Sequence, residues 1–363
     1  MPTPTPVFDD VLAAAARIAP HAVRTPVLHS AELDRWAGAT LLFKAEHLQH
    51  VGAFKFRGAC NAVMALDEDT AMRGVLTHSS GNHGAALAMA ARVRGIPAHV
   101  VVPEGAVASK LANIEAQGAT IHRCAPTLAA REATTARLQA ETGATLVHPY
   151  ADARVIAGQG TAALELLSET GPLDALVVPL GGGGLASGSA IAAAACQPGL
   201  AVFAAEPEGA ADAFESLRQG RHVTDLVPDT VCDGLRATLG APNLALLREH
   251  AVTVLLVSDA EVLAAMREAW ARLRQVVEPS SATVLAAVRR YPGHFAGKRV
   301  GLILSGGNVD LDALLLQGSE PFCPEGREVC QIPAPVQGLA PGAGQGGGEL
   351  CPVGMIEQAE GEL

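Results

Sequence analysis

Short apolar stretches alternate with longer alanine-rich stretches along most of the chain. The short stretches are rich in valine, leucine and isoleucine, as buried strands are, and the longer ones have the length and composition of helices. The predicted strands are 39–46, 74–80, 98–103, 120–125, 175–181, 201–207, 252–258 and 299–307. The predicted helices are 8–18, 57–66, 82–94, 108–117, 128–142, 155–170, 185–196, 210–219, 259–274 and 280–290. This alternation predicts an α/β protein with mostly parallel sheets flanked by helices.

Composition narrows the class of protein. The chain has 363 residues, of which 49% are hydrophobic and 17% are charged, and this length favours about two domains. The net charge of −11 argues against nucleic acid as the main partner. The first ten residues lack the basic and apolar regions of a signal peptide, and prolines and glycines interrupt the apolar segments, so no membrane span is expected. Seven cysteines without a C-x-x-C pair fit reduced thiols in a cytoplasmic protein.

The composition changes at Gly318. Residues 318–363 contain ten glycines, six prolines and seven glutamates but one arginine. Such a segment buries too little apolar surface to offset the entropy of ordering. We therefore expect a disordered tail after a folded part of roughly 1–317.

The segment HVGAFKFRGA, residues 50–59, places Lys55 between Phe54 and Phe56 in a chain that is only 3% aromatic. One interpretation is the start of an amphipathic helix whose Lys55 and Arg57 point into water. The other is a lysine held in a partly apolar site, where its pKa falls and its amine can react. This segment alone leaves both interpretations open.

Two segments place an unusual turn between a predicted strand and a helix. In THSSGNHGAALAMAA, residues 77–91, five small or polar residues run from Ser79 to His83. A capped helix start accounts for one of them, whereas a carboxylate site at the helix N-terminus accounts for more. In VVPLGGGGLASG, residues 177–188, four glycines allow successive backbone N–H groups to converge on a phosphate. A flexible hinge is the alternative for that loop.

Two further segments are less decisive. LILSGGNVD, residues 302–310, ends a predicted strand in Ser305 and two glycines, where ligands bind in α/β sheets, although a simple turn also explains it. VVEPSSATVLAA, residues 276–287, sets Glu278 in an apolar run, which also suits a carboxylate at a helix N-terminus. Together, a phosphate loop and one special lysine point to a pyridoxal phosphate (PLP) enzyme, in which a lysine binds the cofactor aldehyde.

Seven segments carry a more specific resemblance. They are, in order, FKAEHLQHVGAFKFRGA, THSSGNHGAALA, VIAGQGTAALE, VVPLGGGGLASG, FAAEPEGAAD, EPSSA and LSGGNVDL. Their order and spacing resemble the serine racemase and serine/threonine dehydratase family over essentially 5–317. The resemblance implies PLP-dependent fold type II, which is tryptophan synthase β-like, and a homodimer. It implies a large domain of 1–70 plus 150–317, a small domain of 71–149, and the cofactor between them.

The resemblance also implies cofactor contacts at matching positions. Lys55 matches the lysine that forms the Schiff base with PLP, and Ser305 would face the pyridine nitrogen. A neutral hydroxyl there leaves that nitrogen less protonated and favours rapid β-elimination. The other implied contacts are Phe54 beside the ring, Asn82 at the 3-hydroxyl, and Gly181, Gly182, Gly183, Gly184 and Leu185 around the phosphate.

The resemblance implies substrate contacts at the end of the predicted strand 74–80 and at the start of the helix that follows it. Ser79, Asn82 and His83 would hold the carboxylate of a small amino acid. Ser80 resembles the second catalytic base of the racemases, on the face opposite Lys55.

The segment AAEPEGAAD resembles the divalent-cation loop of the family. Glu206 and Asp212 would supply carboxylates and Ala210 a backbone carbonyl. These hard oxygen ligands suit Mg²⁺ or Ca²⁺. A solvated acidic loop is the alternative.

The chain departs from the family pattern at three positions. Ala53 replaces the usual serine, Tyr150 stands where relatives carry a smaller or different group, and Ala237 replaces a racemase serine that contacts substrate. The last change weakens the case for racemisation. No regulatory domain of the biosynthetic threonine deaminase kind is expected after residue 317.

Three functions follow as hypotheses. The first is a PLP-dependent ammonia-lyase that removes water and ammonia from L-threonine or L-serine to give a 2-keto acid. The second is a serine racemase or a 3-hydroxyaspartate dehydratase. The third is a catalytically silent PLP-binding or amino-acid-binding protein, against which Lys55 and Ser80 argue. The sequence does not rank serine against threonine.

Overall fold

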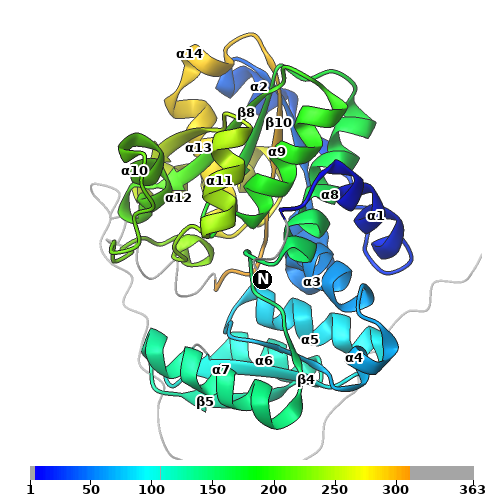
Figure 1. Ribbon diagram of the computed structural model, residues 1–363. Coiled ribbons are helices and arrows are strands. Elements are labelled where there is room, and N and C mark those ends of the chain that lie inside the picture. The colour runs from blue at the N-terminus through cyan, green and yellow to red at the C-terminus, as the bar shows by residue number, and fades with distance from the viewer. Residues whose placement is uncertain (1–4, 107, 311–363) are drawn as a thin grey trace, which may run out of the picture. The chain divides into compact units, whose positions relative to one another are not determined.

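The computed structural model describes residues 5–106 and 108–310 (Figure 1). The predicted tail, 318–363, lies outside the described residues. The helices of the described residues are α1 (Phe8–Ile18), α2 (Ala31–Ala37), α3 (Lys55–Met64), α4 (Glu68–Met72), α5 (Asn82–Arg94), α6 (Ala108–Ala116), α7 (Leu128–Thr142), α8 (Ala153–Thr170), α9 (Gly184–Cys196), α10 (Asp212–Gln219), α11 (Ala241–Glu249), α12 (Asp259–Glu268), α13 (Pro279–Arg290) and α14 (Pro292–Phe295). Short helical turns are η1 (Glu46–Leu48), η2 (His50–Gly52), η3 (Glu208–Ala210), η4 (Asp233–Leu235) and the π-turn η5 (Ala269–Leu273).

The larger of two sheets has six strands in the order β1-β2-β10-β7-β8-β9. These strands are β1 (Val27–His29), β2 (Thr40–Lys44), β7 (Ala175–Pro179), β8 (Ala201–Pro207), β9 (Thr253–Val257) and β10 (Arg299–Ile303). The strand β1 pairs antiparallel with β2, and every other pair is parallel. Because β10 pairs with both β2 and β7, the last described strand lies between two earlier ones.

The smaller sheet has four parallel strands in the order β5-β4-β3-β6. They are β3 (Val75–Thr77), β4 (Ala98–Pro103), β5 (Thr120–Cys124) and β6 (Thr145–Leu146). Figure 1 shows them in cyan and green with α5, α6 and α7. The prediction of an α/β fold with mostly parallel sheets is confirmed. The domain boundaries at 70/71 and 149/150 stay a prediction.

Several elements differ from the prediction. The strands β1 and β6 and the helices α2, α4, α11 and α14 were not predicted. All of them except α11 are too short to set up a clear hydrophobic period, and α11 has only a weak one. Both ends of α2 nevertheless carry recognisable capping residues. At its N-terminus the Ser30 side chain accepts the N–H of Leu33, and at its C-terminus Gly38 lies in the left-handed region at φ 70°. The predicted helix 259–274 continues from α12 into the π-turn η5.

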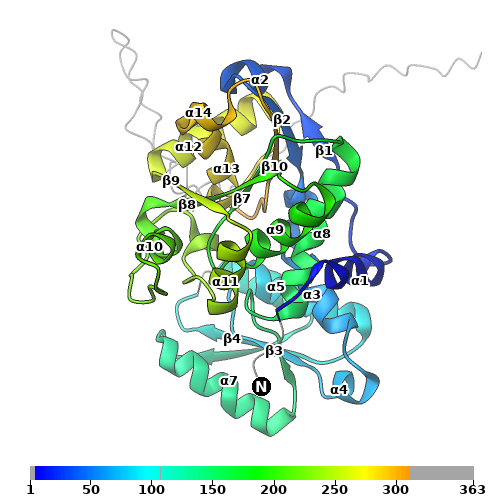
Figure 2. The same cartoon turned by 45° about the horizontal axis from the view of Figure 1, so that its top comes forward.

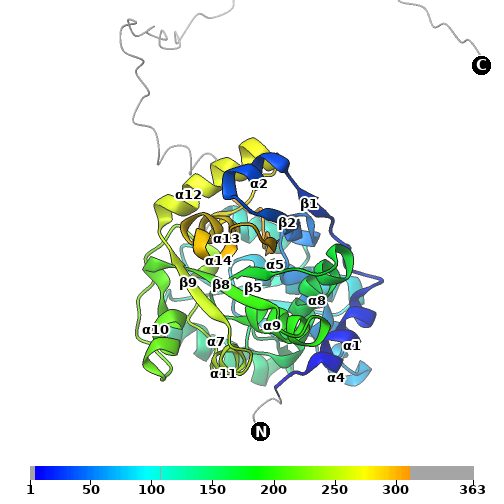
Figure 3. The same ribbon diagram turned by 90° about the horizontal axis from the view of Figure 1, so that it is seen from above.

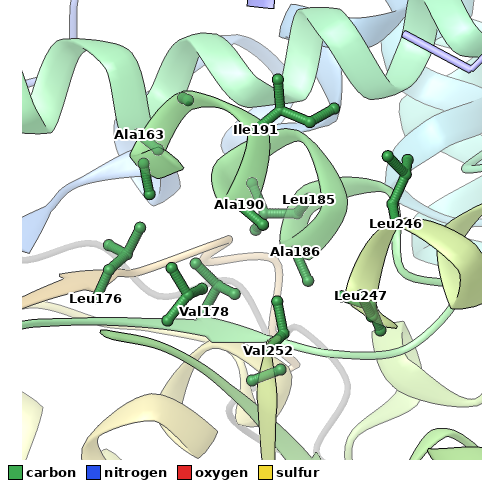
Figure 4. Packing of buried hydrophobic residues seen from close by; sticks show 14 of the residues in the cluster. Ala163, Leu176, Val178, Leu185, Ala186, Ala190, Ile191, Leu246, Leu247 and Val252 are labelled. Carbon is green, nitrogen blue, oxygen red and sulfur yellow. The ribbon is translucent and has the colours of Figure 1, made fainter. Parts of the chain in front are cut away.

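In the core of the larger sheet, α9 packs on β7 and α11 packs on α9. Figure 4 shows the contributing side chains, which are Leu176 and Val178 from β7, Leu185, Ala186, Ala190 and Ile191 from α9, Leu246 and Leu247 from α11, and Val252. Leu185 is only 4% exposed. The helix that follows the four glycines is therefore anchored from its first turn, which fixes the direction of its N-terminus.

Helices α3, α8 and α9 pack closely through glycines. A Cβ on Gly160 of α8 would lie 2.6 Å from the carbonyl oxygen of Gly188 on α9. A Cβ on Gly158 would lie 2.7 Å from the Cα of Gly58 on α3. Figures 2 and 3 show α8 beside α9, and Figure 2 shows α3 close to α8. Small residues let these backbones approach, so the helix that begins at Lys55 has a fixed place against α8. In the described part of the chain, no helix is both long and apolar enough to cross a membrane.

Candidate active site

A cavity of about 620 Å³ brings most of the predicted site residues together. Its walls come from segments of both sheets. Among the predicted residues, those that line it are Phe54, Lys55, Ser79, Ser80, Asn82, His83, Gly181, Gly182, Gly183, Gly184, Leu185 and Ser305. The predicted cation ligands Glu206, Ala210 and Asp212 are not in this wall.

Lys55 is the first residue of α3 and its amine lies in the cavity. Its Nζ donates to the carbonyl oxygen of Pro149 at 3.1 Å and lies 5.0 Å from the centre of the Phe54 ring. Burial lowers the pKa of Lys55 to about 8, although the charge of Glu278 opposes this shift. The site is therefore the partly apolar one of the second interpretation, and an appreciable fraction of the amine is neutral near pH 8.

Arg57, two residues further on, is completely buried rather than solvent-exposed. Its Nε donates to Glu46 at 2.7 Å, and both terminal nitrogens donate to Glu165 on α8 at 2.7 Å. Glu165 also pairs with Lys44 at 2.7 Å. A planar guanidinium suits two carboxylates held in this way. These bonds tie the first turn of α3 to α8, to η1 and to the end of β2.

The glycine loop before α9 is packed and shaped rather than flexible. Gly183 is in the left-handed region at φ 93°, and a Cβ on Gly182 would lie 2.3 Å from Cγ of Tyr150. Asn243 of α11 donates to the carbonyl oxygens of Gly182 at 2.6 Å and Tyr150 at 2.9 Å. No side chain caps α9, so the N–H groups of its first turn remain available in the cavity wall. These features suit a phosphate group and disfavour the hinge alternative.

The helix α5 presents a second uncapped N-terminus to the same cavity. Gly81 is its N-cap and no side chain caps it, so the alternative of an ordinary Ser or Asn cap does not hold. In particular, Ser80 lines the cavity without capping the helix. Of Ser79 and Ser80, only Ser79 forms a hydrogen bond with the nearby backbone, and its Oγ accepts the Gly81 N–H at 3.5 Å. The free N–H groups of Asn82 and His83 can bind a carboxylate.

The imidazole of His83 is poorly suited to bind that carboxylate itself. Its Nε2 lies 3.2 Å from the carbonyl oxygen of Val147, so Nε2 carries the hydrogen and Nδ1 is an acceptor. Burial, and then the charge of Lys55, hold the pKa of His83 well below its usual value. The contribution of His83 to an anion site therefore comes from its backbone N–H.

Ser305 follows β10 at the floor of the cavity and is 2% exposed. Its carbonyl oxygen accepts the N–H of Phe54 at 2.9 Å. The loop after β10 is thereby joined to the residue before Lys55. At residue 305 this loop offers the cavity a neutral hydroxyl rather than a carboxylate.

Several cavity residues were not predicted as site residues, namely Lys110, Arg131, His148, Tyr150, Asp233 and Glu278. Lys110 of α6 forms an ion pair with Asp233 of η4. Arg131 has a buried Nε without a hydrogen-bond partner among the described residues. Two of them were noted in the sequence, Tyr150 as a departure from the family pattern and Glu278 as a carboxylate inside an apolar run. Burial raises its pKa to about 7, and its side chain accepts from Asn82 rather than capping α13.

The predicted cation ligands lie at the start of α10. Glu206 is fully buried and accepts the N–H groups of Ala213 and Phe214, each at 2.9 Å. Asp212 accepts the N–H of Leu239 at 2.7 Å. Burial raises the pKa of Glu206 to about 8. Glu206 and Asp212 are both buried, so the solvated alternative does not hold for these two carboxylates. No group of three His, Cys, Asp or Glu side chains within the described ranges is arranged to bind a metal.

The cavity thus combines a desolvated amine with two uncapped helix N-termini. The glycine loop presents backbone rather than side chains to the cavity, since a Cβ on Gly181, Gly182 or Gly183 would collide with the protein behind it. A lysine amine that is partly neutral near pH 8 can condense with an aldehyde. These residues fit PLP, with Lys55 at its aldehyde and the α9 loop at its phosphate.

We predict that Lys55, in protein freed of PLP, titrates about two pH units below an ordinary lysine of pKa about 10.4. Burial destabilises the ammonium, so the neutral amine accumulates as the pH rises through about 8. Limited acetylation across the pH range, read by peptide mass spectrometry, measures this midpoint, with the exposed Lys298 as reference. A midpoint for Lys55 near that of ordinary lysines would contradict the desolvated site.

Comparison with known proteins agrees with this geometry. The pyridoxal-phosphate dependent enzyme family matches residues 18–306. The chain is 48% identical to a beta-hydroxyaspartate dehydratase of Paracoccus denitrificans, covering 85% of this chain and 98% of the relative. It is 47% identical to a serine racemase of Arabidopsis thaliana, covering 82% and 92%. The structure of maize serine racemase superposes with a TM-score of 0.83 at 43% identity, covering 86% and 97%. The chain belongs to the pyridoxal-phosphate dependent enzymes of the serine racemase and serine/threonine dehydratase type.

Proposed function

We propose that this enzyme is an ammonia-lyase that converts 3-hydroxy amino acids into 2-oxo acids and ammonia, with L-3-hydroxyaspartate preferred over L-serine and L-threonine. The observation that carries the preference is Arg131, a cation in the cavity wall without a partner among the described side chains. The likeness to a protein named beta-hydroxyaspartate dehydratase supports the same substrate. Action on L-threonine or L-serine remains part of the proposal as the weaker activity.

The charges of the cavity favour a substrate with two carboxylates. The α-carboxylate has a site at the N-terminus of α5, which needs no cationic side chain. Lys110 is already neutralised by Asp233, and Arg236 donates to the carbonyl oxygen of Thr230. Arg131 is left with its donors free, and a guanidinium recognises a carboxylate through paired hydrogen bonds. Serine and threonine have no group that would use it.

PLP, when bound, withdraws electrons from the α-carbon of an amino acid so that its Cα proton becomes acidic. Lys55 anchors the cofactor and, once its amine is released, accepts the Cα proton. The first turn of α5 orients the substrate carboxylate, with Ser79 beside it. Gly181 to Gly184 and Leu185 hold the phosphate. The substrate then loses its 3-hydroxyl as water and its amino group as ammonia, with one water taken up to leave the 2-oxo acid.

The remaining roles in the cofactor site follow the family. Phe54 packs beside the ring, Asn82 contacts the 3-hydroxyl and Ser305 faces the pyridine nitrogen. We also propose the large domain, 1–70 plus 150–317, and the small domain, 71–149, on either side of the cofactor. A homodimer and a cytoplasmic location remain proposals of the same standing.

The substrate preference is tested by Arg131→Met. Loss of a charge-assisted hydrogen-bonding partner should lower kcat/KM for L-threo-3-hydroxyaspartate about 10- to 100-fold. The values for L-serine and L-threonine should stay within about threefold, because they leave the guanidinium unused. Arg131→Lys keeps the positive charge but not the paired donors of the guanidinium. Its kcat/KM for L-threo-3-hydroxyaspartate should lie between those of Arg131→Met and the parent enzyme. Equal losses on all three substrates would contradict a distal-carboxylate role.

Racemisation of serine is the second candidate, favoured by Ser80 in the same cavity as Lys55. Racemisation needs a proton donor on each face of the substrate, whereas elimination from an L-amino acid needs only Lys55. Ala237 in the cavity wall supplies no hydroxyl, which favours elimination. Ser80→Ala should abolish D-serine formation and elimination from D-serine while largely sparing elimination from L-serine. If the variant loses activity on both enantiomers alike, Ser80 has no face-specific role.

We also propose that the α10 loop binds Mg²⁺ or Ca²⁺ through Glu206, Asp212 and the carbonyl oxygen of Ala210. Two buried carboxylates with raised pKa values would be stabilised in their charged forms by a cation. Treatment with a chelator should therefore lower the melting temperature, and added Mg²⁺ or Ca²⁺ should restore it. The assignment fails if metal-free and metal-loaded protein melt at the same temperature and turn over at the same rate.

A further inference from the structure

Asn82 is held by two side chains that no role described so far explains. It is the first residue of α5, next to the smaller sheet. Its Nδ2 lies 3.2 and 3.1 Å from the two carboxylate oxygens of Glu278, and its Oδ1 accepts from Nδ2 of Asn308 at 2.9 Å. Both partners come from segments next to the larger sheet. The two ends of the Asn82 amide are therefore distinguished by their neighbours.

The direction of the Asn82 amide follows from one backbone carbonyl. Nδ2 of Asn308 also donates to the carbonyl oxygen of Val51 at 2.7 Å. A carbonyl oxygen can only accept, so the nitrogen of Asn308 must lie on this side. That nitrogen meets Oδ1 of Asn82, which leaves Nδ2 of Asn82 facing Glu278. The arrangement is complete only when the side chain of residue 278 accepts a hydrogen bond from Nδ2 of Asn82.

Burial and a backbone hydrogen bond fix the position of Glu278. It is 4% exposed, its N–H donates to the carbonyl oxygen of Gly306 at 3.0 Å, and it precedes α13 without capping it. A Cβ on Gly306 would lie 2.6 Å from the Glu278 carboxylate. The absence of a side chain at Gly306 thus makes room for this carboxylate beside the loop of Ser305.

We propose that Glu278 is a positioning residue that, with Asn308, fixes the orientation in which Asn82 meets the cofactor. The inference rests on the proposed contact between Asn82 and PLP. One Nδ2 hydrogen of Asn82 is directed to Glu278, and the other remains for the ligand. Without the acceptor, the amide can rotate and present its oxygen or leave a buried donor unpaired.

The test measures PLP retained by the holoenzyme after equilibrium dialysis at pH 8.5, above the raised pKa of Glu278. Glu278→Leu should weaken PLP binding about three- to tenfold, the value of one oriented hydrogen bond. Glu278→Gln should stay within about twofold of the parent, because its side-chain oxygen still accepts from Asn82. Asn308→Ala, an independent variant if Glu278→Leu folds poorly, should match Glu278→Leu.

The decisive comparison uses Asn82→Ala as background. If Glu278 acts through Asn82, Glu278→Leu adds no further loss of PLP affinity to Asn82→Ala. Glu132→Leu, which removes another cavity carboxylate that lacks a bond to Asn82, is the matched control and should leave affinity unchanged. Three outcomes would overturn the proposal. The losses from Glu278→Leu and Asn82→Ala add fully, or Glu278→Leu and Glu278→Gln lose PLP affinity equally. In the third, Glu278→Leu has no effect although Asn82→Ala weakens binding. If Asn82→Ala itself leaves PLP affinity unchanged, the contact between Asn82 and the cofactor fails and the proposal with it, whereas the lyase reaction does not.

Discussion

The buried guanidinium of Arg57 is the interaction on which the position of Lys55 depends. It satisfies two carboxylates, Glu46 and Glu165, that come from different elements. Removing one member of such a cluster leaves a buried charge and typically costs about 3–5 kcal/mol. The close approach of Gly58 to Gly158 adds steric definition to the same contact. The reactive amine thus extends from a helix whose first turn has little freedom.

Two helix N-termini allow the cavity to bind anions at low cost in net charge. The α9 loop and the first turn of α5 each present free N–H groups, and neither is capped by a side chain. Backbone donors are fixed by the fold and do not lose side-chain entropy when a ligand binds. A cofactor phosphate and a substrate carboxylate can therefore be held while the cationic side chains remain available for selectivity. We propose that Arg131 is the side chain that selects the substrate.

Much of the fold and part of the site could be predicted because their signals are local. The strand β4 is a short apolar run and the helix α7 is a long alanine-rich stretch, and the bounds of both match the prediction. Lys55, the four glycines and Ser305 lie in short motifs whose chemistry depends on neighbours in sequence. The partners of Asn82 could not be read in this way, because Glu278 is 196 residues away along the chain. Arg131 looked like any charge on a helix surface, and only the fold places it in the cavity.

All the roles proposed for this cavity require that Lys55 carries the cofactor. Reducing the PLP-loaded enzyme with borohydride and mapping its peptides by mass spectrometry tests this directly. The account predicts a pyridoxyl group on the peptide that contains Lys55 and on no other lysine peptide. A modified lysine elsewhere, or an unmodified Lys55 in enzyme that retains PLP, would contradict it.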